Sequence, residues 1–290
     1  MKKRGLVVEG GGMRSAYASG ALYALQELKI QKFDVVVGTS AGACCAINFV
    51  GGEALNNFKI LHDYLTGNRF IRFSKIPTRQ NIVDVDYLLD EVIQHHVPLP
   101  IEAVKKTKTE IFITATDCET GQAIYFPFNE KDLIERLRAS CAMPYFYRRK
   151  VMYQGHRLID GGVAASIPIQ KVIEKKCDEM VVISTRPKGY RKKPNPVGWI
   201  NHIFFPRHPQ MVKAFNERWK EYNQTLDWLE NPPHGVKVIL IRPQAELDLA
   251  RTTRDRNKIK KGFEQGYQDA MQILRNQFSD DLTSPQSIAI

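Results

Sequence analysis

The sequence predicts an α/β fold, a three-layer α/β/α sandwich with a mostly parallel central sheet. Over the first two-thirds of the chain, short runs rich in β-branched residues alternate with segments whose apolar residues recur every three or four positions. This alternation is typical of a parallel sheet covered by helices. The 290 residues are 43% hydrophobic and 25% charged, an ordinary globular composition that excludes a disordered chain, a collagen-like repeat and a disulfide miniprotein.

The elements follow from these patterns in chain order. Apolar, β-branched runs predict strands at residues 5–8, 33–37, 110–115, 123–126, 180–184 and 236–241. Helical spacing of apolar residues, or helix-favouring composition after a turn, predicts helices at residues 13–28, 40–50, 54–65, 131–141, 168–175, 211–229 and 255–278. Residues 186–209 contain five prolines and little periodicity, which predicts a long loop or lid.

The domain organisation is inferred from the last predicted strand. The strand at 236–241 has no sheet of its own to join. We therefore expect residues 176–290 to form a C-terminal extension, with a basic Pro-rich loop and helices, that completes the same domain as residues 5–175.

The charge of the chain favours an anionic partner. Lys and Arg number 42 against 31 Asp and Glu, which gives a formal net charge of +11. Nucleic acid, phosphate and a lipid surface are the partners that such an excess suits. Basic clusters at residues 67–75, 186–193 and 251–261 are candidate contacts. Nucleic acid is disfavoured because the sequence has no RNP, KH or helix-turn-helix signature.

The cysteines and the apolar runs bear on the compartment. Five cysteines without C-x-x-C spacing, mostly inside apolar runs, predict reduced packing residues and no metal site. The first apolar run, residues 6–8, is too short for the core of a signal peptide, and nowhere do 18 apolar residues follow one another. We expect a cytoplasmic protein without a transmembrane helix, whose membrane contact would be peripheral.

A candidate nucleophile, Ser40, lies in a G-T-S-A-G segment between a predicted strand and a predicted helix. G-x-S-x-G in this context is the pattern of a nucleophile elbow, which holds the serine in a strained, exposed turn. Gly38 and Gly42 would let the strand and the helix approach closely. The positive end of the helix dipole would favour alkoxide character on the serine. The alternative is a small-residue turn in which Ser40 caps the helix.

A glycine-rich loop follows the first predicted strand and precedes a helix. A dinucleotide site would use G-x-G-x-x-G here, but Ser15 occupies the third glycine position. An acyl hydrolase would use the exposed N–H groups of the loop to stabilise an oxyanion, with Arg14 adding positive potential. A plain tight turn is a third interpretation. An elbow at the same carboxyl edge of the sheet favours the oxyanion site.

A nucleophilic serine needs a proton acceptor, and the distinctive candidate is Asp160. It follows the apolar pair Leu158-Ile159 and precedes Gly161 and Gly162. The alternative is an Asp-Gly turn at the surface. A triad in the order Ser, Asp, His is also open on paper, and its histidine would be His202, His208 or His234.

Together and in this order, the glycine loop, the elbow and the Asp-Gly-Gly motif resemble the patatin-like phospholipase family. The resemblance extends over roughly residues 5–175 and includes the A-S-C-A-M-P segment at 139–144, which is similar to the family's A-S-x-A-x-P. The chain looks most like uncharacterised bacterial patatin-like proteins. It departs from the family pattern at Ser15, where family loops commonly have glycine after the basic residue.

The resemblance implies the patatin-like acyl hydrolase fold and a lipid acyl hydrolase of phospholipase A type, which uses a Ser-Asp dyad and no cofactor. By it, Ser40 is the nucleophile, Asp160 is the proton acceptor, and the oxyanion hole consists of Gly10, Gly11, Gly12 and Arg14. The implied substrate is a lipid or ester, and the basic clusters suit peripheral contact with an anionic membrane. A triad carboxylesterase and a catalytically weak lipid-binding or membrane-binding protein remain alternatives.

Overall fold

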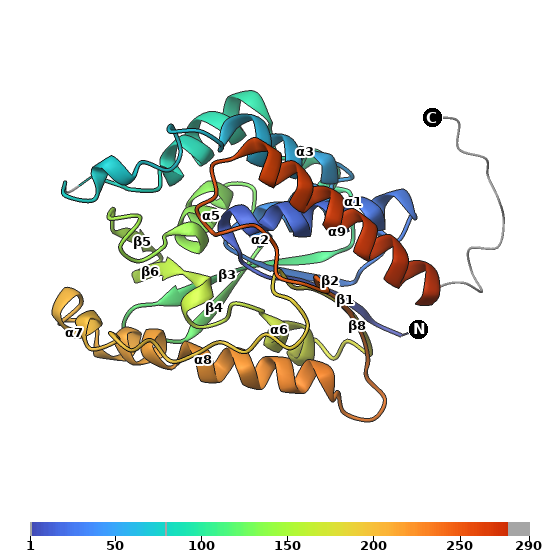
Figure 1. The fold of residues 1–290 in the computed structure, drawn as a ribbon. Helices are drawn as coiled ribbons and strands as arrows, with labels where there is room; N and C mark the ends of the chain where they lie inside the picture. Colours follow the sequence, from blue (N-terminus) through green and yellow to red (C-terminus); the bar gives the residue numbers. More distant parts are fainter. Residues whose placement is uncertain (1, 79, 278–290) are drawn as a thin grey trace.

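The computed structural model describes residues 2–78 and 80–277. One mixed sheet forms its centre, with the strand order β5-β6-β3-β2-β1-β7-β8 and with β4 paired to β3 (Figure 1). The strands are β1 (Arg4–Val8), β2 (Val35–Thr39), β3 (Glu110–Asp117), β4 (Ala123–Pro127), β5 (Val151–Tyr153), β6 (His156–Asp160), β7 (Glu179–Ile183) and β8 (Lys237–Ile241). The neighbouring strands β3, β2, β1, β7 and β8 pair in parallel. Strands β4 and β6 each pair antiparallel with β3, and β5 pairs antiparallel with β6.

Helices cover both faces of the sheet. One face carries α1 (Ser15–Glu27), α2 (Ala41–Val50), α3 (Ala54–Lys59), α5 (Leu133–Cys141) and α9 (Arg256–Gln277), and the other carries α6 (Ile169–Glu174) and α8 (Pro209–Glu230) (Figure 1). The shorter helical segments are η1 (Gly12–Arg14), η2 (Ile60–Tyr64), η3 (Phe73–Lys75), η4 (Tyr87–His96), α4 (Ile101–Lys105), η5 (Gly161–Val163) and α7 (Ile200–Phe204). The predicted three-layer sandwich is confirmed.

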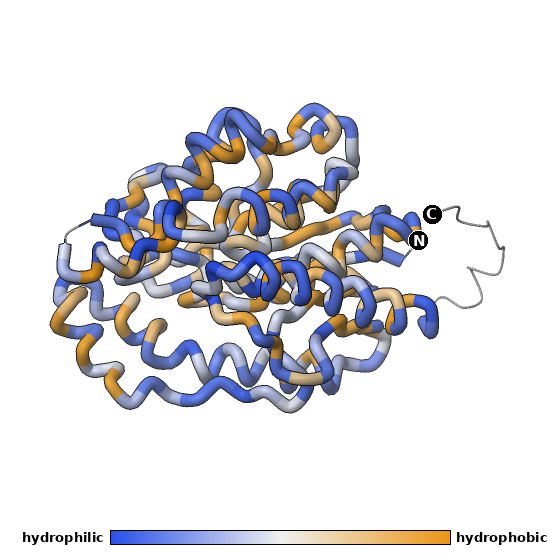
Figure 2. The backbone as a smooth tube through the Cα atoms, turned by 45° about the horizontal axis from the view of Figure 1, so that its top comes forward, coloured by the Kyte–Doolittle hydropathy of each residue, from blue (hydrophilic) through white to orange (hydrophobic). Residues whose placement is uncertain are grey.

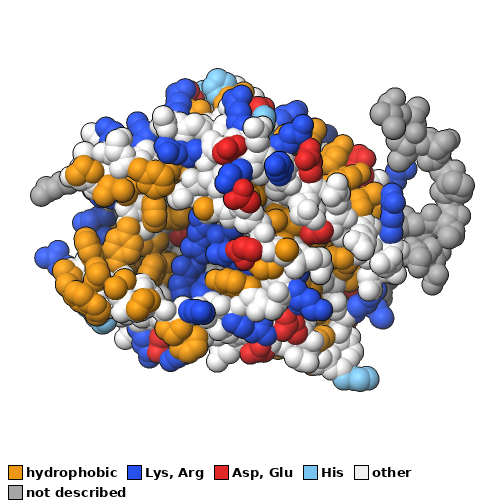
Figure 3. Space-filling view, in the orientation of Figure 1, with side chains coloured by type: hydrophobic (Ala, Val, Ile, Leu, Met, Phe, Trp, Pro, Cys, Tyr) orange, Lys and Arg blue, Asp and Glu red, His pale blue; other side chains and the backbone are white. Residues whose placement is uncertain are grey.

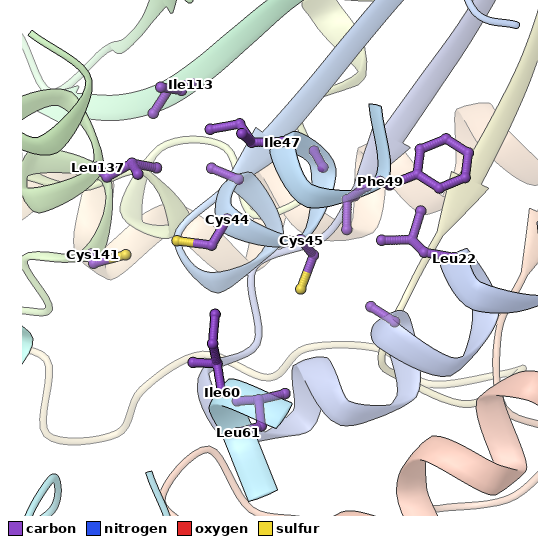
Figure 4. Close-up of a cluster of buried hydrophobic side chains, with 14 of the residues drawn as sticks. Leu22, Cys44, Cys45, Ile47, Phe49, Ile60, Leu61, Ile113, Leu137 and Cys141 are labelled. Carbon is purple, nitrogen blue, oxygen red and sulfur yellow. The ribbon is translucent and has the colours of Figure 1, made fainter. Parts of the chain in front are cut away.

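The core lies in two layers, one on each side of the sheet. Figure 2 shows hydrophobic residues concentrated in the central strands, while the helices around them alternate between hydrophobic and hydrophilic positions. Strands β1 and β2 are buried on both faces, as strands covered by helices must be. Figure 4 shows the core beside α2, where the sulfur atoms of Cys44 and Cys141 point toward each other. All five cysteines are buried free thiols, as predicted.

The C-terminal extension is attached to the rest of the fold through the sheet and through α9. Its strand β7 pairs in parallel with β1, and β8 pairs in turn with β7 at one edge of the sheet. Helix α9 lies directly against α1, because Gly20 and Gly266 leave no side chain between the two backbones: a Cβ atom on either would overlap a backbone oxygen of the other helix. Close contact through glycines lets two helices exclude solvent along their shared face.

Several elements differ from the sequence prediction. Strands β5 and β6 form a short antiparallel hairpin that strand patterning did not indicate. The π-helical segment η4 was not predicted either, although its apolar residues recur at helical spacing. The predicted loop at 186–209 contains α7, and the predicted helix at 54–65 changes to π-helical geometry at Ile60. The predicted end of the last helix, Phe278, lies outside the described residues.

Among the residues that the structure describes, no helix combines the length and the apolar character needed to cross a bilayer.

We predict that Gly266→Ala destabilises the fold. Alanine favours a helix over glycine by about 0.8–1 kcal/mol, yet its methyl group would overlap the Tyr17 carbonyl oxygen of α1. Overpacking of this kind costs about 1–3 kcal/mol. Urea unfolding should therefore give a lower free energy of unfolding for Gly266→Ala. The control is Lys261→Ala on the exposed face of α9. Equal stability of the two variants would contradict the close contact between α1 and α9.

Candidate active site

Ser40 occupies the tight turn between β2 and α2, with φ 55° and ψ −130°. Left-handed φ is unfavourable for a residue with a side chain and is typical of a nucleophile elbow. Two hydrogen bonds hold the turn: the Ser40 N–H donates to Ser140 Oγ over 2.8 Å, and Ser140 Oγ donates to the Thr114 carbonyl over 2.7 Å. The strained turn is therefore held by α5 and β3.

The two glycines of the elbow lie where neighbouring backbone is too close for a side chain. A Cβ atom on Gly42 would lie 2.6 Å from the Val8 carbonyl oxygen, and one on Gly38 would lie 2.6 Å from the Ala43 Cα. Real Cβ atoms do not approach other heavy atoms this closely. The sequence pattern at 38–42 thus has the close-packing role that was predicted for it.

The register of the sheet brings Asp160 to Ser40. Thr39, the last residue of β2, pairs with Thr114, and Asp160, the last residue of β6, pairs with the next residue of β3, Ala115. Strand β4 occupies one edge of β3. Strands β2 and β6 therefore both pair with the opposite edge of β3. Strand β6 continues the edge where β2 ends, and Ser40 and Asp160 therefore meet across 120 positions of sequence.

Asp160 is 7% exposed. Burial raises the pKa of its carboxyl group, because the ionised form loses water. Hydrogen bonds from the Ser40 side chain and from the Gly162 N–H, the latter 2.7 Å from Oδ1, lower the pKa in part, as do the charges of Arg251 and Arg218. The carboxylate is thus desolvated, in contact with the serine, and accompanied by two cations.

The glycine loop presents two free N–H groups near Ser40. Gly12 has a φ of 54°, which favours glycine. A Cβ atom on Gly12 would also lie only 2.7 Å from the Arg251 carbonyl oxygen. Within the described part of the chain, the N–H groups of Gly11 and Gly12 have no hydrogen-bond acceptor. The Gly10 N–H donates to the Ser166 carbonyl over 3.1 Å. The expectation that Gly10 offers an oxyanion donor is therefore wrong for its N–H group, although Gly10 does line the cavity at Ser40.

Arg14 lies behind the loop. Its Nε donates to Thr185 Oγ1 over 3.3 Å, and its side chain lines a neighbouring cavity that Ser40 does not line. The guanidinium groups that line the cavity at Ser40 come from Arg218 of α8 and from Arg251. The Arg14 side chain therefore lies next to the glycine loop but does not line the cavity at Ser40. No motif marked Arg218, and only the basic cluster at 251–261 pointed toward Arg251.

A cavity of about 130 Å³ opens at Ser40 and Asp160. Its remaining walls are largely apolar, and the side chains that form them are Met143, Pro144, Tyr145, Phe146, Val163 and Phe215. None of the seven histidines, all of which lie in the described ranges, lines this cavity. His202 and His234 are exposed, and His208 Nδ1 lies 3.0 Å from Glu119 Oε1. The triad alternative therefore has no histidine at the site.

The described residues contain no group of three or more His, Cys, Asp or Glu side chains that could hold a metal ion.

Two family models match the chain. The patatin-like phospholipase model matches residues 6–173, more than half of the 290 residues, and a domain of unknown function (DUF6363) matches residues 208–279. The chain is 25% identical over 249 residues to the uncharacterized protein YjjU of Escherichia coli K12, which covers 83% of this chain and 69% of YjjU. It is also 25% identical over 213 residues to the probable lipid hydrolase 463L of Invertebrate iridescent virus 6, covering 64% of this chain and 71% of that protein.

Two solved structures are also similar. VipD from Legionella pneumophila matches with a TM-score of 0.48 and 14% identity, over 95% of this chain and 67% of VipD. The type III effector ExoU matches with a TM-score of 0.42 and 14% identity, over 96% of this chain and about half, 53%, of ExoU. Because the matched family model spans both Ser40 and Asp160, the chain belongs to the patatin-like phospholipase family, and this membership supports lipid hydrolase activity.

Proposed function

We propose that the protein is a serine hydrolase of phospholipase A type, which cleaves carboxylic ester bonds of lipids with Ser40 as nucleophile and Asp160 as proton acceptor. The observation that carries this proposal is that the strained Ser40 and the buried Asp160 carboxyl group line one cavity, whose walls are largely apolar. A strained serine, a desolvated base and free N–H donors are the three parts that acyl transfer needs.

The reaction would proceed in two halves. Ser40 Oγ attacks the acyl carbonyl carbon while Asp160 takes the hydroxyl proton, and the N–H groups of Gly11 and Gly12 stabilise the oxyanion. The intermediate collapses to an acyl-enzyme as the C–O bond to the alcohol breaks, and Asp160 returns the proton to that alcohol. Water then loses a proton to Asp160, attacks the acyl carbon and releases the fatty acid, and the proton returns to Ser40.

The environment of Asp160 suits it to act without histidine. A carboxylate with an ordinary pKa of about 3.9 is a weak base toward a hydroxyl group. Burial raises the pKa of Asp160 and so strengthens the base, and Ser40 and Asp160 line the same cavity, which brings the hydroxyl group to the base. Arg218 and Arg251 favour the ionised carboxylate in the resting enzyme, which is the form that accepts a proton.

An apolar rim connects the cavity with the surface and favours a lipid substrate. Tyr145 lines the cavity, and its ring lies 5.3 Å from that of Phe204 and 6.1 Å from that of Phe215. Around α7, Val197, Trp199, Ile203 and Phe204 are 50–65% exposed. Figure 3 shows hydrophobic side chains gathered on this side of the molecule. We propose that the rim (Val197, Trp199, Ile203, Phe204) inserts peripherally into a membrane surface and lets an acyl chain reach Ser40.

Of the alternatives, a triad carboxylesterase lacks support from the cavity, where no described histidine lies. A lipid-binding protein without useful catalysis is consistent with the same apolar rim. Activity measurements on dyad variants distinguish it from a hydrolase.

We predict that Ser40→Ala and Asp160→Asn each lower kcat/KM for a short-chain p-nitrophenyl ester by 100-fold or more. Asp160→Asn should not destabilise the protein at pH 7. Burial raises the folded-state pKa of Asp160 above its unfolded value, so its ionisation opposes folding at a pH above that pKa, and a neutral amide removes this cost. An active Asp160→Asn variant would exclude the dyad, and a fully active Ser40→Ala variant would exclude the nucleophile.

The pH dependence of kcat/KM should follow Asp160. Activity is expected to fall as the pH decreases through the pKa of Asp160, at a midpoint above the ordinary 3.9 of an aspartate. Removing the nearby charge in Arg251→Gln should move this midpoint to higher pH, because Arg251 lowers the pKa of Asp160. The control, Lys213→Gln on the exposed face of α8, should leave the midpoint in place. A midpoint that Arg251→Gln does not move would argue against Asp160 as the titrating base.

The triple variant Trp199→Ser, Ile203→Ser, Phe204→Ser should bind lipid vesicles at least ten-fold more weakly in a sedimentation assay. Each exposed apolar side chain contributes roughly 1.5–3 kcal/mol when it leaves water completely, so partial insertion of three suffices. The control is Met152→Ser, which removes a 58% exposed side chain of β5 outside the rim. Equal loss in both variants, or no loss in the triple variant, would contradict insertion through the rim.

A further inference from the structure

A second, larger cavity adjoins the one at Ser40. Its volume is about 720 Å³, and Phe215, Arg218 and Arg251 line both cavities. With the exception of Arg14, its walls come from residues 186–195, from α8 and from residues 246–251. These segments all lie beyond the patatin-like match at 6–173. The cavity is therefore a feature that the C-terminal extension adds next to the proposed catalytic centre.

Five cations of this cavity have no ion-pair partner in the described part of the chain: Arg14, Lys192, Lys193, Arg218 and Arg251. Figure 3 shows Lys and Arg side chains gathered in a hollow beside the hydrophobic side of the molecule. The two acids in the cavity wall are engaged elsewhere, because Glu246 pairs with Arg186, and Asp248 pairs with Lys258 at 2.8 Å. The cavity wall thus carries uncompensated positive charge.

Neutral groups and buried carboxylates hold these cations in place, and Asp160 is the carboxylate beside Arg218. Lys192 Nζ donates to Ser166 Oγ over 3.3 Å, and Arg218 donates to the Gly162 carbonyl over 2.5 Å. The Nε of Arg218 is buried and has no acceptor. Glu9 raises the pKa of Lys192, but its carboxylate already accepts hydrogen bonds from Ser184, Thr185 and Tyr222. N–H donors therefore remain available to a ligand.

The cations also oppose one another. Burial, and then repulsion by Arg251, lowers the pKa of Arg14 and of Arg218 to about 10. Burial, with Arg218 and Arg251, lowers the pKa of Lys192 well below its usual value. Glu221 is the other acid beside Lys192, and burial raises the pKa of Glu221 to about 7, so its negative charge is only partial near neutral pH. An anion among these groups would relieve the repulsion.

We infer that this cavity binds the phosphate of a lipid whose headgroup carries net negative charge, and that the proposed hydrolase acts on such lipids. The inference rests on the proposed function. Arginine forks bind phosphate oxygens in pairs and lysine adds a point charge, which suits a phosphate group better than a neutral headgroup. A choline headgroup would place its own positive charge among the five unpaired cations of the cavity and is disfavoured. Because Arg218 and Arg251 face both cavities, a phosphate held by them leaves its acyl ester beside Ser40.

The test measures binding by calorimetry in the Ser40→Ala protein, so that no hydrolysis occurs. The probes are dihexanoyl phosphatidic acid, dihexanoyl phosphatidylcholine and inorganic phosphate, all as monomers in solution. Phosphatidic acid is expected to bind at least ten-fold more tightly than either of the others. Equal affinity for the two lipids would overturn the proposal. Inorganic phosphate that binds as tightly as phosphatidic acid would also overturn it, in favour of a site for a free anion.

Charge variants in the same background locate the binding site. Lys192→Gln and Arg251→Gln should each weaken the binding of phosphatidic acid ten-fold or more, with a smaller effect on phosphatidylcholine. Lys213→Gln, an exposed lysine of α8 outside the cavity, is the matched control. Circular dichroism spectra and thermal unfolding identify any variant that fails to fold. If one of the two variants does not fold, the affinity of the other one tests the cavity. Unchanged affinity in folded Lys192→Gln and Arg251→Gln would exclude this cavity.

Kinetics with Ser40 intact separate this inference from the proposed function. The ratio of kcat/KM for phosphatidic acid to that for p-nitrophenyl butyrate should fall at least ten-fold in Lys192→Gln. If the protein binds phosphatidic acid as expected but hydrolyses neither substrate, the proposed function is wrong and the phosphate site stands as a binding site. If it hydrolyses both substrates and the ratio is the same in Lys192→Gln, the phosphate site is wrong and the hydrolase stands.

Discussion

The antiparallel pairing of β6 with the end of β3 is the constraint on which the candidate site depends. Strand β2 ends at Thr39, and β6 continues along the same edge of β3 with Asp160 opposite Ala115. This pairing places Asp160 beside the end of β2, where its side chain is buried. The same burial that makes the ionised carboxylate costly makes it a stronger base, and the hydroxyl group that shares its cavity, proposed to be its partner, is that of Ser40.

The C-terminal extension supplies charge to a candidate site whose proposed reacting groups, Ser40 and Asp160, come from the rest of the chain. Arg218 of α8 and Arg251, which precedes α9, both line the cavity at Ser40. The backbone carbonyl of Arg251 also accepts a hydrogen bond from the Met13 N–H at 3.0 Å, so the extension contacts the glycine loop directly. Much of the basic cluster at 186–193 is engaged within the molecule: Arg186 and Arg191 form ion pairs with acidic residues of the extension. Part of the basic character of the chain is therefore neutralised by ion pairs within the extension.

The central strands could be predicted from sequence because burial on both faces leaves an apolar run, as at 35–37. The motifs at 38–42 and 160–162 could also be recognised in the sequence. Neighbouring atoms come so close at these positions that only glycine fits, which leaves glycines at a defined spacing. Strands β5 and β6 were not predicted, because polar residues such as His156 and Arg157 interrupt a short edge hairpin. The segment η4 could have been found from the spacing of Leu88, Leu89, Val92 and Ile93. The partner of the Gly10 N–H, Ser166, is a tertiary contact that no local pattern reveals.

The central claim is that Asp160 activates Ser40. The most direct measurement is the rate at which a fluorophosphonate labels the protein, with the modified residue located by mass spectrometry of peptides. The account predicts rapid labelling at Ser40 in the unaltered protein and labelling at least 100-fold slower in folded Asp160→Asn. Labelling of Ser40 at the same rate in Asp160→Asn, or labelling at another residue while Ser40 stays unmodified, would contradict it.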